Sequence, residues 1–263
     1  ARKLFIPGPI DVMPDVLEKM ATPMIGHRGK DASALQESVS KKLQKLFYTE
    51  SEILLSTSSG SGLMEGAIRS CTSRKAAVFS CGAFGDRWYK MAVTNNVKAD
   101  LYNVDMGKAI TPEMVETALA TGQYDLIAVQ HNETSTGITN PIEEIAEVVN
   151  KYKDVIFCVD AVSSAGGAKI EVDKLGIDIL ITSTQKALGL PPGMAICTFS
   201  ERAIKRAETV EFRGTYFDLL AMYKYLKKKN YQYPSTPSLS HMFAMNYQLD
   251  NILKEGLDKR FKT

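Results

Sequence analysis

A single lysine, Lys186, follows a short apolar run at residues 179–181 and precedes a Pro-Pro-Gly turn. The apolar run predicts a buried strand, and a lysine at the end of such a strand is costly to bury unless it is paired or neutral. Desolvation lowers the pKa of a lysine and turns its amine into a nucleophile. Because a lone loop lysine is more often simply solvated, a nucleophilic Lys186 needs support from elsewhere in the chain.

A run of small polar residues, Ser-Thr-Ser-Ser-Gly-Ser-Gly at 56–62, separates a predicted strand at 53–55 from a predicted helix starting at Leu63. Backbone N–H groups and hydroxyls at the positive end of a helix can hold a phosphate. A flexible loop explains this motif equally well. Neither the Gly-Lys-Ser/Thr ending of a P-loop nor a G-x-G-x-x-G motif is present, which disfavours ATP and NAD.

Two more candidate residues follow predicted strands. Phe84 stands between two glycines, where an aromatic ring could cover a flat ligand, although core packing is the commoner explanation. Asp160 follows the apolar run 155–159 and could instead be a helix cap or a buried ion-pair partner. Pyridoxal phosphate is held by two such groups. A lysine forms a Schiff base with its aldehyde, and a carboxylate pairs with its ring nitrogen. Asp160 and Lys186 therefore support each other.

These residues depend on a repeated order of strand, polar loop and helix. Strands are expected at 53–55, 76–80, 99–104, 125–130, 155–159 and 179–181, and helices from Pro14, at 31–48 with Asp31 or Ser33 as cap, from Leu63, to about Asn95, at 111–121 and at 141–152. Apolar strands without alternation are buried on both faces. The pattern predicts an α/β fold with three layers, α/β/α, around a mainly parallel central sheet. Ligands of such sheets bind at the carboxyl ends of the strands, so the candidate residues should converge on one edge.

Composition narrows the function classes. The 263 residues include 32 basic and 30 acidic side chains, which gives no reason to expect a nucleic-acid partner. No apolar run has membrane-spanning length and no signal-peptide pattern is present, so a cytoplasmic protein without membrane contact is expected. Three scattered histidines make a metal site unexpected, and the four cysteines suggest buried free thiols in a reducing compartment.

Several stretches together resemble one family. VDAVSSAGG (159–167) and TSTQKALGLPPG (182–193) are similar to the hallmark stretches of class V aminotransferases, which have the type I pyridoxal phosphate fold. SSGSGLMEGA (58–67), HNETSTG (131–137) and FIPGP (5–9) are similar to the branch of alanine–glyoxylate and serine–pyruvate aminotransferases. The resemblance covers nearly the whole chain and implies pyridoxal 5'-phosphate as cofactor.

The resemblance also implies roles for individual residues. Lys186 would be the Schiff-base lysine and proton carrier, and Asp160 the partner of the pyridinium nitrogen. The other implied cofactor residues are Ser61, Gly62 and Gln185 at the phosphate, with Leu63 beside them, Thr134 near the ring oxygen and Phe84 stacked on the ring. Gly8 would lie by the substrate. Tyr233 and Thr236 would reach the phosphate of a partner subunit, which implies a homodimer with active sites at the interface.

The same resemblance predicts the domain organisation. Residues 1–20 would form an N-terminal arm, 21–253 the large cofactor-binding domain, and 254–263 the start of a C-terminal small α+β domain that is largely absent. In the family an arginine of that small domain binds the substrate carboxylate, and Arg260 is not a good match for it. The chain lacks an initial methionine and ends in a charged, helix-like stretch, so it is expected to be incomplete.

The predicted activity is a ping-pong transamination between serine or alanine and pyruvate or glyoxylate through Lys186. A 2-aminoethylphosphonate transaminase has similar motifs and stays open as an alternative. A cysteine desulfurase is disfavoured, since such enzymes usually stack a histidine where this chain has Phe84 and need a mobile cysteine. A catalytically silent scaffold of the same fold is the non-enzymatic alternative. The sequence does not identify the donor or the acceptor.

Overall fold

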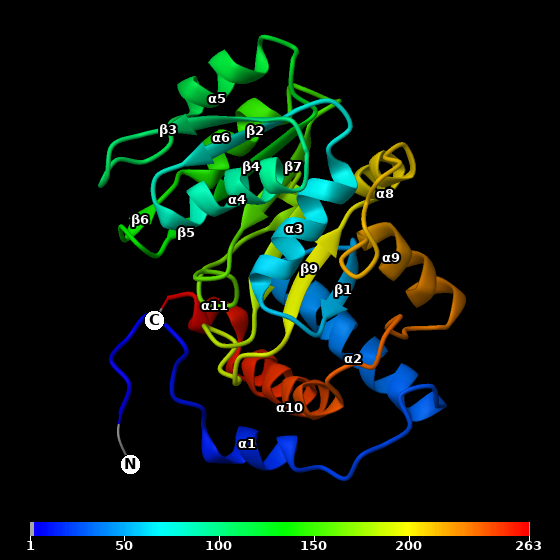
Figure 1. Cartoon of the computed structure of the whole chain (residues 1–263). Coiled ribbons are helices and arrows are strands. Elements are labelled where there is room, and N and C mark those ends of the chain that lie inside the picture. Colours follow the sequence, from blue (N-terminus) through cyan, green and yellow to red (C-terminus); the bar gives the residue numbers. More distant parts are fainter. Residues whose placement is uncertain (1–2, 263) are drawn as a thin grey trace.

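The computed structural model describes residues 3–262, and in this part of the chain a seven-stranded sheet lies between two layers of helices (Figure 1). The order of the strands across the sheet is β1-β9-β8-β7-β4-β2-β3. Their bounds are β1 Glu52–Ser56, β2 Ala76–Ser80, β3 Ala99–Asn103, β4 Leu126–Gln130, β7 Ile156–Asp160, β8 Ile179–Ser183 and β9 Ala195–Phe199. Two short strands, β5 (Asn132–Glu133) and β6 (Ile138–Thr139), form a separate hairpin in the predicted polar loop.

The sheet is parallel except at one strand. β9 runs antiparallel to both of its neighbours, β1 and β8, whereas the other neighbouring strands are parallel. The predicted α/β fold with a mainly parallel sheet is therefore confirmed. β9 was not singled out in the sequence, because a short apolar run identifies neither the type nor the direction of an element.

Each face of the sheet is covered by its own helices, as predicted for a three-layer fold. One face packs against α2 (Lys30–Phe47), α5 (Pro112–Leu119), α6 (Ile142–Val149), α7 (Val172–Leu175) and α10 (Leu239–Glu255). The other face packs against α3 (Gly60–Cys71), α4 (Ala83–Thr94), α8 (Glu201–Glu208) and α9 (Leu219–Lys228). Successive residues of the central strands alternate between these two apolar clusters, which explains why the strands are apolar throughout.

Two predicted helix starts differ from the structure. α3 begins at Gly60 instead of Leu63, so Ser61 and Gly62 belong to its first turn. A Cβ atom at Gly60 would lie 2.9 Å from Cγ2 of Val162, so close packing, not helix propensity, favours glycine there. α2 begins at Lys30 with Gly29 as its N-cap and no side-chain cap, so the predicted cap at Asp31 or Ser33 is wrong. Asp31 instead adds negative charge to the first turn.

The two ends of the described chain lie on the same side of the molecule. The arm of residues 3–13 leads to α1 (Pro14–Met20), which lies against α10 (Figure 1). After α10 the short helix α11 (Leu257–Arg260) returns toward the edge of the sheet. The domain boundaries at residues 20 and 253 stay a prediction. No helix among the described residues is both long and apolar enough to cross a membrane.

Candidate active site

A cavity of about 280 Å³ opens at the carboxyl edge of the sheet, next to the ends of β1, β2, β4, β7 and β8. This volume is near the lower limit for small-molecule sites, about 300 Å³. The predicted residues that line it are Gly8, Ser61, Phe84, Thr134, Asp160, Gln185 and Lys186. The predicted convergence of strand ends on one edge is therefore confirmed.

Lys186 follows β8 on a loop that is fixed at both ends. The Thr184 hydroxyl donates to the Pro191 carbonyl at 2.6 Å, and the Thr184 amide donates to the Met194 carbonyl. The Nζ atom of Lys186 donates to the Pro7 carbonyl of the N-terminal arm at 3.0 Å. Burial lowers the pKa of the Lys186 amine, and the negative charge of Asp160 opposes that shift. The amine is thus easier to deprotonate than an ordinary lysine, as a nucleophile requires.

Asp160 is the last residue of β7, and its side chain is only 5% exposed. Its Oδ1 accepts the Val162 amide at 3.0 Å. Burial raises the pKa of the carboxyl to about 6, although the Val162 hydrogen bond and the positive charges of Arg87 and Lys186 lower it. A carboxylate held at the bottom of a cavity with one protein donor can accept a hydrogen bond from a ligand.

The start of α3 forms the opposite wall of the cavity. Ser59, Gly60 and Ser61 line it there, and the N-cap residue Ser59 makes no side-chain capping hydrogen bond. Ser183, whose residue is 1% exposed, lines the same cavity with an Oγ atom that has no partner among the described residues. The Oε1 atom of Gln185 is likewise buried and unpaired. Buried polar atoms without partners are unusual. The Ser183 hydroxyl lies next to the start of α3, where it can donate to an anion, whereas the Gln185 oxygen can only accept a hydrogen bond.

Phe84 reaches the cavity from the first turn of α4, and a buried carboxylate holds this turn. The Glu133 side chain, 0% exposed, accepts hydrogen bonds from the amides of Phe84 and Gly85 and from Ser135. Thr134, the next residue, pairs its hydroxyl with that of Ser163 at 2.5 Å. The hairpin of β5 and β6 therefore fixes the position of Phe84.

Three residues near the site were missed by sequence reasoning. Arg87 lines the cavity, Glu133 holds the turn of Phe84, and Arg260 joins two loops of the site. Arg260 donates to the carbonyls of Gly166 and Ala187, each at 2.6 Å. Its guanidinium is thus engaged by backbone oxygens and by the Glu255 carboxylate, 2.9 Å away, which agrees with its poor match to a substrate-binding arginine. The Phe-Gly-Asp-Arg stretch after a strand is a local sequence pattern that could have identified Arg87 as a site residue. Arg260 has no such pattern, because it donates to residues more than 70 positions away in the sequence.

Four predicted cofactor residues do not line this cavity. Gly62 and Leu63 lie in the first turn of α3, and Leu63 is fully buried. Tyr233 is 5% exposed and borders a small hollow with Ser56 and Thr57 inside its own chain, whereas Thr236 is exposed. The contact of these two residues with a partner's phosphate stays a prediction.

A larger hollow of about 660 Å³ lies at the amino edge of the sheet, between Thr72 and Phe212. None of the residues that follow the carboxyl ends of the parallel strands lines it. Volume alone therefore does not identify it as the functional site, whereas the smaller cavity brings together a lysine, a carboxylate and unpaired polar atoms.

Comparison with known proteins identifies the family and agrees with the fold. The family model "Aminotransferase class-V" matches residues 10–261, so the chain belongs to the class V aminotransferases. An uncharacterized aminotransferase from Methanocaldococcus jannaschii is 43% identical over 98% of this chain and 68% of its own length. A serine–glyoxylate aminotransferase from Arabidopsis thaliana is 29% identical over 97% of this chain and 65% of its own length. The crystal structure of an alanine–glyoxylate aminotransferase from Nostoc sp. is similar with a TM-score of 0.93 at 28% identity, over all of this chain and 70% of that one.

Proposed function

We propose that this chain binds pyridoxal 5'-phosphate on Lys186 and transfers an amino group from a small amino acid to a 2-oxo acid. The observation that carries the proposal is the common cavity of Lys186, Asp160 and the N-terminus of α3. The unpaired Ser183 hydroxyl, the N-terminus of α3 and the single protein donor at Asp160 fit a ligand with a phosphate and a basic ring nitrogen. When bound, this cofactor supplies an electron-accepting ring that stabilises negative charge on the substrate carbon.

Each residue then has a defined task. Ser61, Gln185 and the first-turn amides of α3 hold the phosphate, and Asp160 keeps a proton on the ring nitrogen. Phe84 covers the ring, and Thr134 lies near the ring oxygen. Lys186 would hold the cofactor through Nζ and, once released by the amino donor, its free amine would accept the proton of the substrate Cα atom. Its lowered pKa supports both roles.

Gly8 supports a substrate position next to Lys186. A Cβ atom at residue 8 would lie 2.6 Å from Cδ of Lys186, and the φ angle of Gly8 is +150°. Only glycine lets the N-terminal arm approach the lysine this closely. The arm therefore forms the wall where we expect the substrate to enter.

Glyoxylate and pyruvate are the acceptors that we favour, with serine or alanine as donor. The support is the similarity to a serine–glyoxylate aminotransferase and to an alanine–glyoxylate aminotransferase. Cysteine desulfurase activity has little support, because all four cysteines are buried and burial raises the thiol pKa values of Cys71, Cys158 and Cys197. A thiol so placed is a poor mobile nucleophile.

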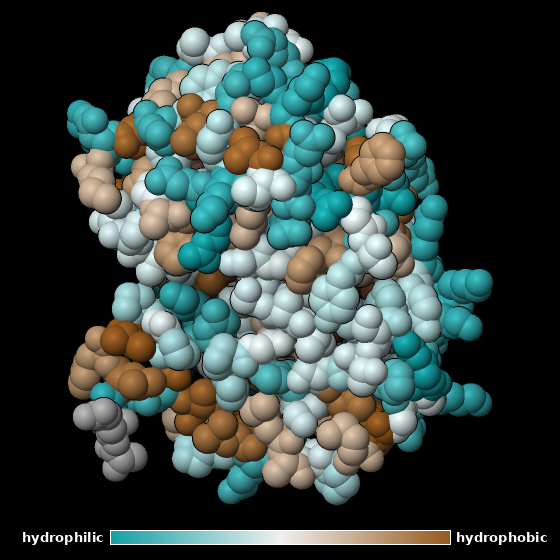
Figure 2. Space-filling model, in the orientation of Figure 1, coloured by the Kyte–Doolittle hydropathy of each residue, from teal (hydrophilic) through white to brown (hydrophobic). Residues whose placement is uncertain are grey.

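We also propose a homodimer with shared sites. The arm, α1 and the loop after α1 carry six of the ten large exposed apolar side chains of the described residues, among them Phe5 (92% exposed), Met13 (64%) and Met24 (66%). Figure 2 shows apolar groups gathered along the arm. Such a patch is typical of a protein interface. Thr236 is exposed enough to reach a partner, whereas Tyr233 would have to turn out of its own chain. A cytoplasmic location stays a prediction.

The test is a half-reaction screen on purified full-length protein loaded with pyridoxal phosphate. Serine, alanine and 2-aminoethylphosphonate are added separately, and loss of the visible absorbance of the bound cofactor is followed. We expect serine or alanine to discharge this absorbance, and Lys186→Ala to lack it from the start. An unchanged absorbance in Lys186→Ala would refute the role of the lysine. A response to the aminophosphonate alone would replace the proposed donor class.

A further inference from the structure

Arg87, the fifth residue of α4, lines the cavity, and the proposed function gives it no task. Its NH1 atom donates to Oγ of Ser61 at 2.9 Å, and its Cζ atom lies 4.7 Å from the ring centroid of Phe84. No carboxylate among residues 3–262 forms an ion pair with it. Arg87 thus touches both groups that we assign to the two ends of the cofactor, the phosphate and the ring.

The guanidinium has donors to spare. An arginine offers five N–H donors in a planar fork that fits carboxylate and phosphate oxygens. Here one donor serves the neutral Ser61 hydroxyl. The other charged side chains that line the cavity are Asp160 and Lys186, and both already have tasks there. Arg87 is therefore a positive charge at the cavity that forms no ion pair within the part of the chain that the structure describes.

Two further features point to an oxyanion beside Ser61. Ser61 is the second residue of the 12-residue helix α3, so the first-turn amides of α3 carry positive partial charge there. Independently, the Oγ atom of Ser183 is buried, unpaired and part of the same cavity wall. A Cβ atom at Gly60 would lie 3.8 Å from this Oγ, which places Ser183 next to the start of α3.

We propose that Arg87 is a ligand of the cofactor's phosphate and makes the site select phosphorylated over unphosphorylated pyridoxal. The inference rests on the proposed function. Hydrogen bonds between an arginine and a phosphate are charge-assisted and stronger than neutral ones. Two cationic side chains among the described residues line the cavity. Arg87 contacts Ser61 at the phosphate end, whereas Lys186 serves the aldehyde end. The contact with Phe84 holds the guanidinium in place before the ligand arrives.

Binding is measured by quenching of the single tryptophan, Trp88, which directly follows Arg87 in α4. Pyridoxal phosphate and pyridoxal are titrated separately into full-length wild type, Arg87→Gln and Arg87→Lys. Lys90→Gln is the matched control, since it removes an exposed positive charge one turn further along the same helix. Inorganic phosphate is then added as a competitor of each ligand.

We expect Arg87→Gln to weaken binding of pyridoxal phosphate by about 10- to 100-fold, as for loss of a charged hydrogen bond, and to leave pyridoxal within about twofold. Arg87→Lys should lose less affinity for pyridoxal phosphate, because lysine keeps the positive charge but lacks the planar fork of N–H donors. Inorganic phosphate should compete with pyridoxal phosphate in wild type and much less in Arg87→Gln. Lys90→Gln should bind both ligands with the affinities of wild type.

Equal weakening of both ligands, or no change for either, would overturn the inference. If Arg87→Gln does not fold, an undiminished preference for the phosphorylated ligand in Arg87→Lys, with unchanged phosphate competition, would also count against it. The proposed function is judged separately by wild type. If wild type binds neither ligand, that proposal fails, whereas a wild type that binds while Arg87→Gln keeps its preference contradicts only the role of Arg87.

Discussion

The two edges of the central sheet each hold a buried aspartate, but in opposite circumstances. At the amino edge, Asp125 is 1% exposed and accepts the backbone amides of Ser73, Arg74 and Lys75. It also pairs with Arg206, 3.2 Å away. At the carboxyl edge, Asp160 is 5% exposed and accepts one amide, that of Val162.

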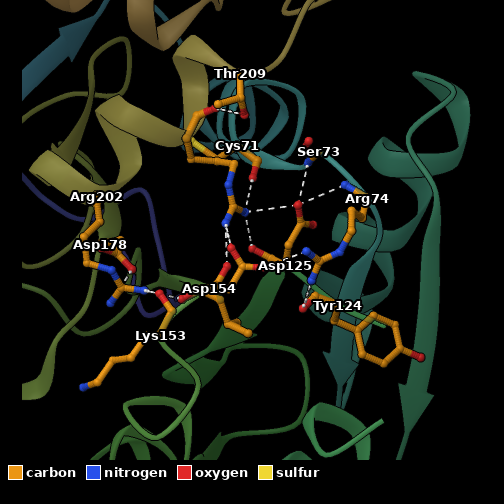
Figure 3. A network of polar contacts seen from close by, with 12 residues as sticks. Cys71, Ser73, Arg74, Tyr124, Asp125, Lys153, Asp154, Asp178, Arg202 and Thr209 are labelled. Carbon is orange, nitrogen blue, oxygen red and sulfur yellow. Dashed lines mark hydrogen bonds and ion pairs between the residues drawn. The ribbon is translucent and has the colours of Figure 1, made fainter. Parts of the chain in front are cut away.

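The difference separates a structural network from a binding site. Figure 3 shows Asp125 inside a group of polar residues that join strand ends to α3 and α8. Arg206 bridges Asp125 and Asp154, and Arg74 pairs with Asp154 at 2.6 Å. At the carboxyl edge, by contrast, Ser183 Oγ and Gln185 Oε1 stay unpaired. A site that holds a ligand keeps polar groups free for it, and this costs stability in its absence.

The largest effect on stability is expected at the amino edge. Asp125→Asn removes the negative charge that compensates the positive charge of Arg206, whose side chain is largely buried, with 11% exposed. Breaking a buried pair on one side typically costs about 3 to 5 kcal/mol. Denaturant unfolding of the cofactor-free protein should show this loss. A change below about 1 kcal/mol would contradict the structural role of the network.

Asp160→Asn should stabilise the folded protein at pH 8, whereas Asp125→Asn destabilises it. The folded-state pKa of Asp160 is raised to about 6 from an ordinary 3.8, so ionisation above pH 6 costs free energy in the folded state. The wild type therefore loses stability as pH rises from about 4 to 6, while the variant, which cannot ionise, does not. We expect the cofactor-free variant to be more stable by about 1 to 3 kcal/mol at pH 8.

The pH dependence is the control for this second prediction. At pH 4 the folded wild type, like the variant, carries a neutral side chain at residue 160, and the two unfolding free energies should agree within about 1 kcal/mol. A stabilisation that is the same at pH 4 and pH 8 would show that packing, not ionisation, is responsible. The variant should also bind pyridoxal phosphate more weakly than wild type.

Arg260→Ala tests how the loops of Asp160 and Lys186 are held together. It removes the hydrogen bonds to the carbonyls of Gly166 and Ala187 together with the ion pair to Glu255, and we expect about 1 to 2 kcal/mol of destabilisation. Cofactor release should become faster, because Ala187 adjoins Lys186. Lys254→Ala, at an exposed position of α10, is the control. If both variants release cofactor at the wild-type rate, the clamp is not needed for the site.

Gly8→Ala should have the smallest effect on stability, about 1 kcal/mol from its positive φ angle. The new methyl group would also push against the Lys186 side chain and weaken cofactor attachment. Gly137→Ala is matched, since Gly137 has a φ angle of +74° and open space around it. We expect a similar stability loss there with unchanged cofactor binding. Equal cofactor binding in the two variants would refute the tight approach of the arm to Lys186.

Most of the fold and part of the site could be predicted from local sequence patterns. Uninterrupted apolar runs identified β2, β4, β7 and β8, and the polar residues after them marked the carboxyl edge. The direction of β9 could not be predicted, because strand pairing is decided by distant partners. The start of α3 was misplaced for a similar reason, since Gly60 is selected by contact with Val162.

The supporting residues were harder to predict than the reacting ones. Lys186 and Asp160 stand at the ends of strands, and their chemistry is unusual for such positions. Glu133, Arg87 and Arg260 act through hydrogen bonds to residues 26 to 94 positions away. No spacing in the sequence reports such contacts. The same limit applies to Tyr233, whose burial depends on packing beside Ser56.

The most direct test of the account is the position of the covalent bond to the cofactor. Full-length protein is incubated with pyridoxal phosphate, reduced with borohydride, digested and analysed by peptide mass spectrometry, with Lys186→Ala treated in parallel. We predict the reduced cofactor on the peptide that contains Lys186, and no stoichiometric label in the variant. Label on other lysines, or equal label in Lys186→Ala, would contradict the central claim that the carboxyl edge holds the cofactor on Lys186.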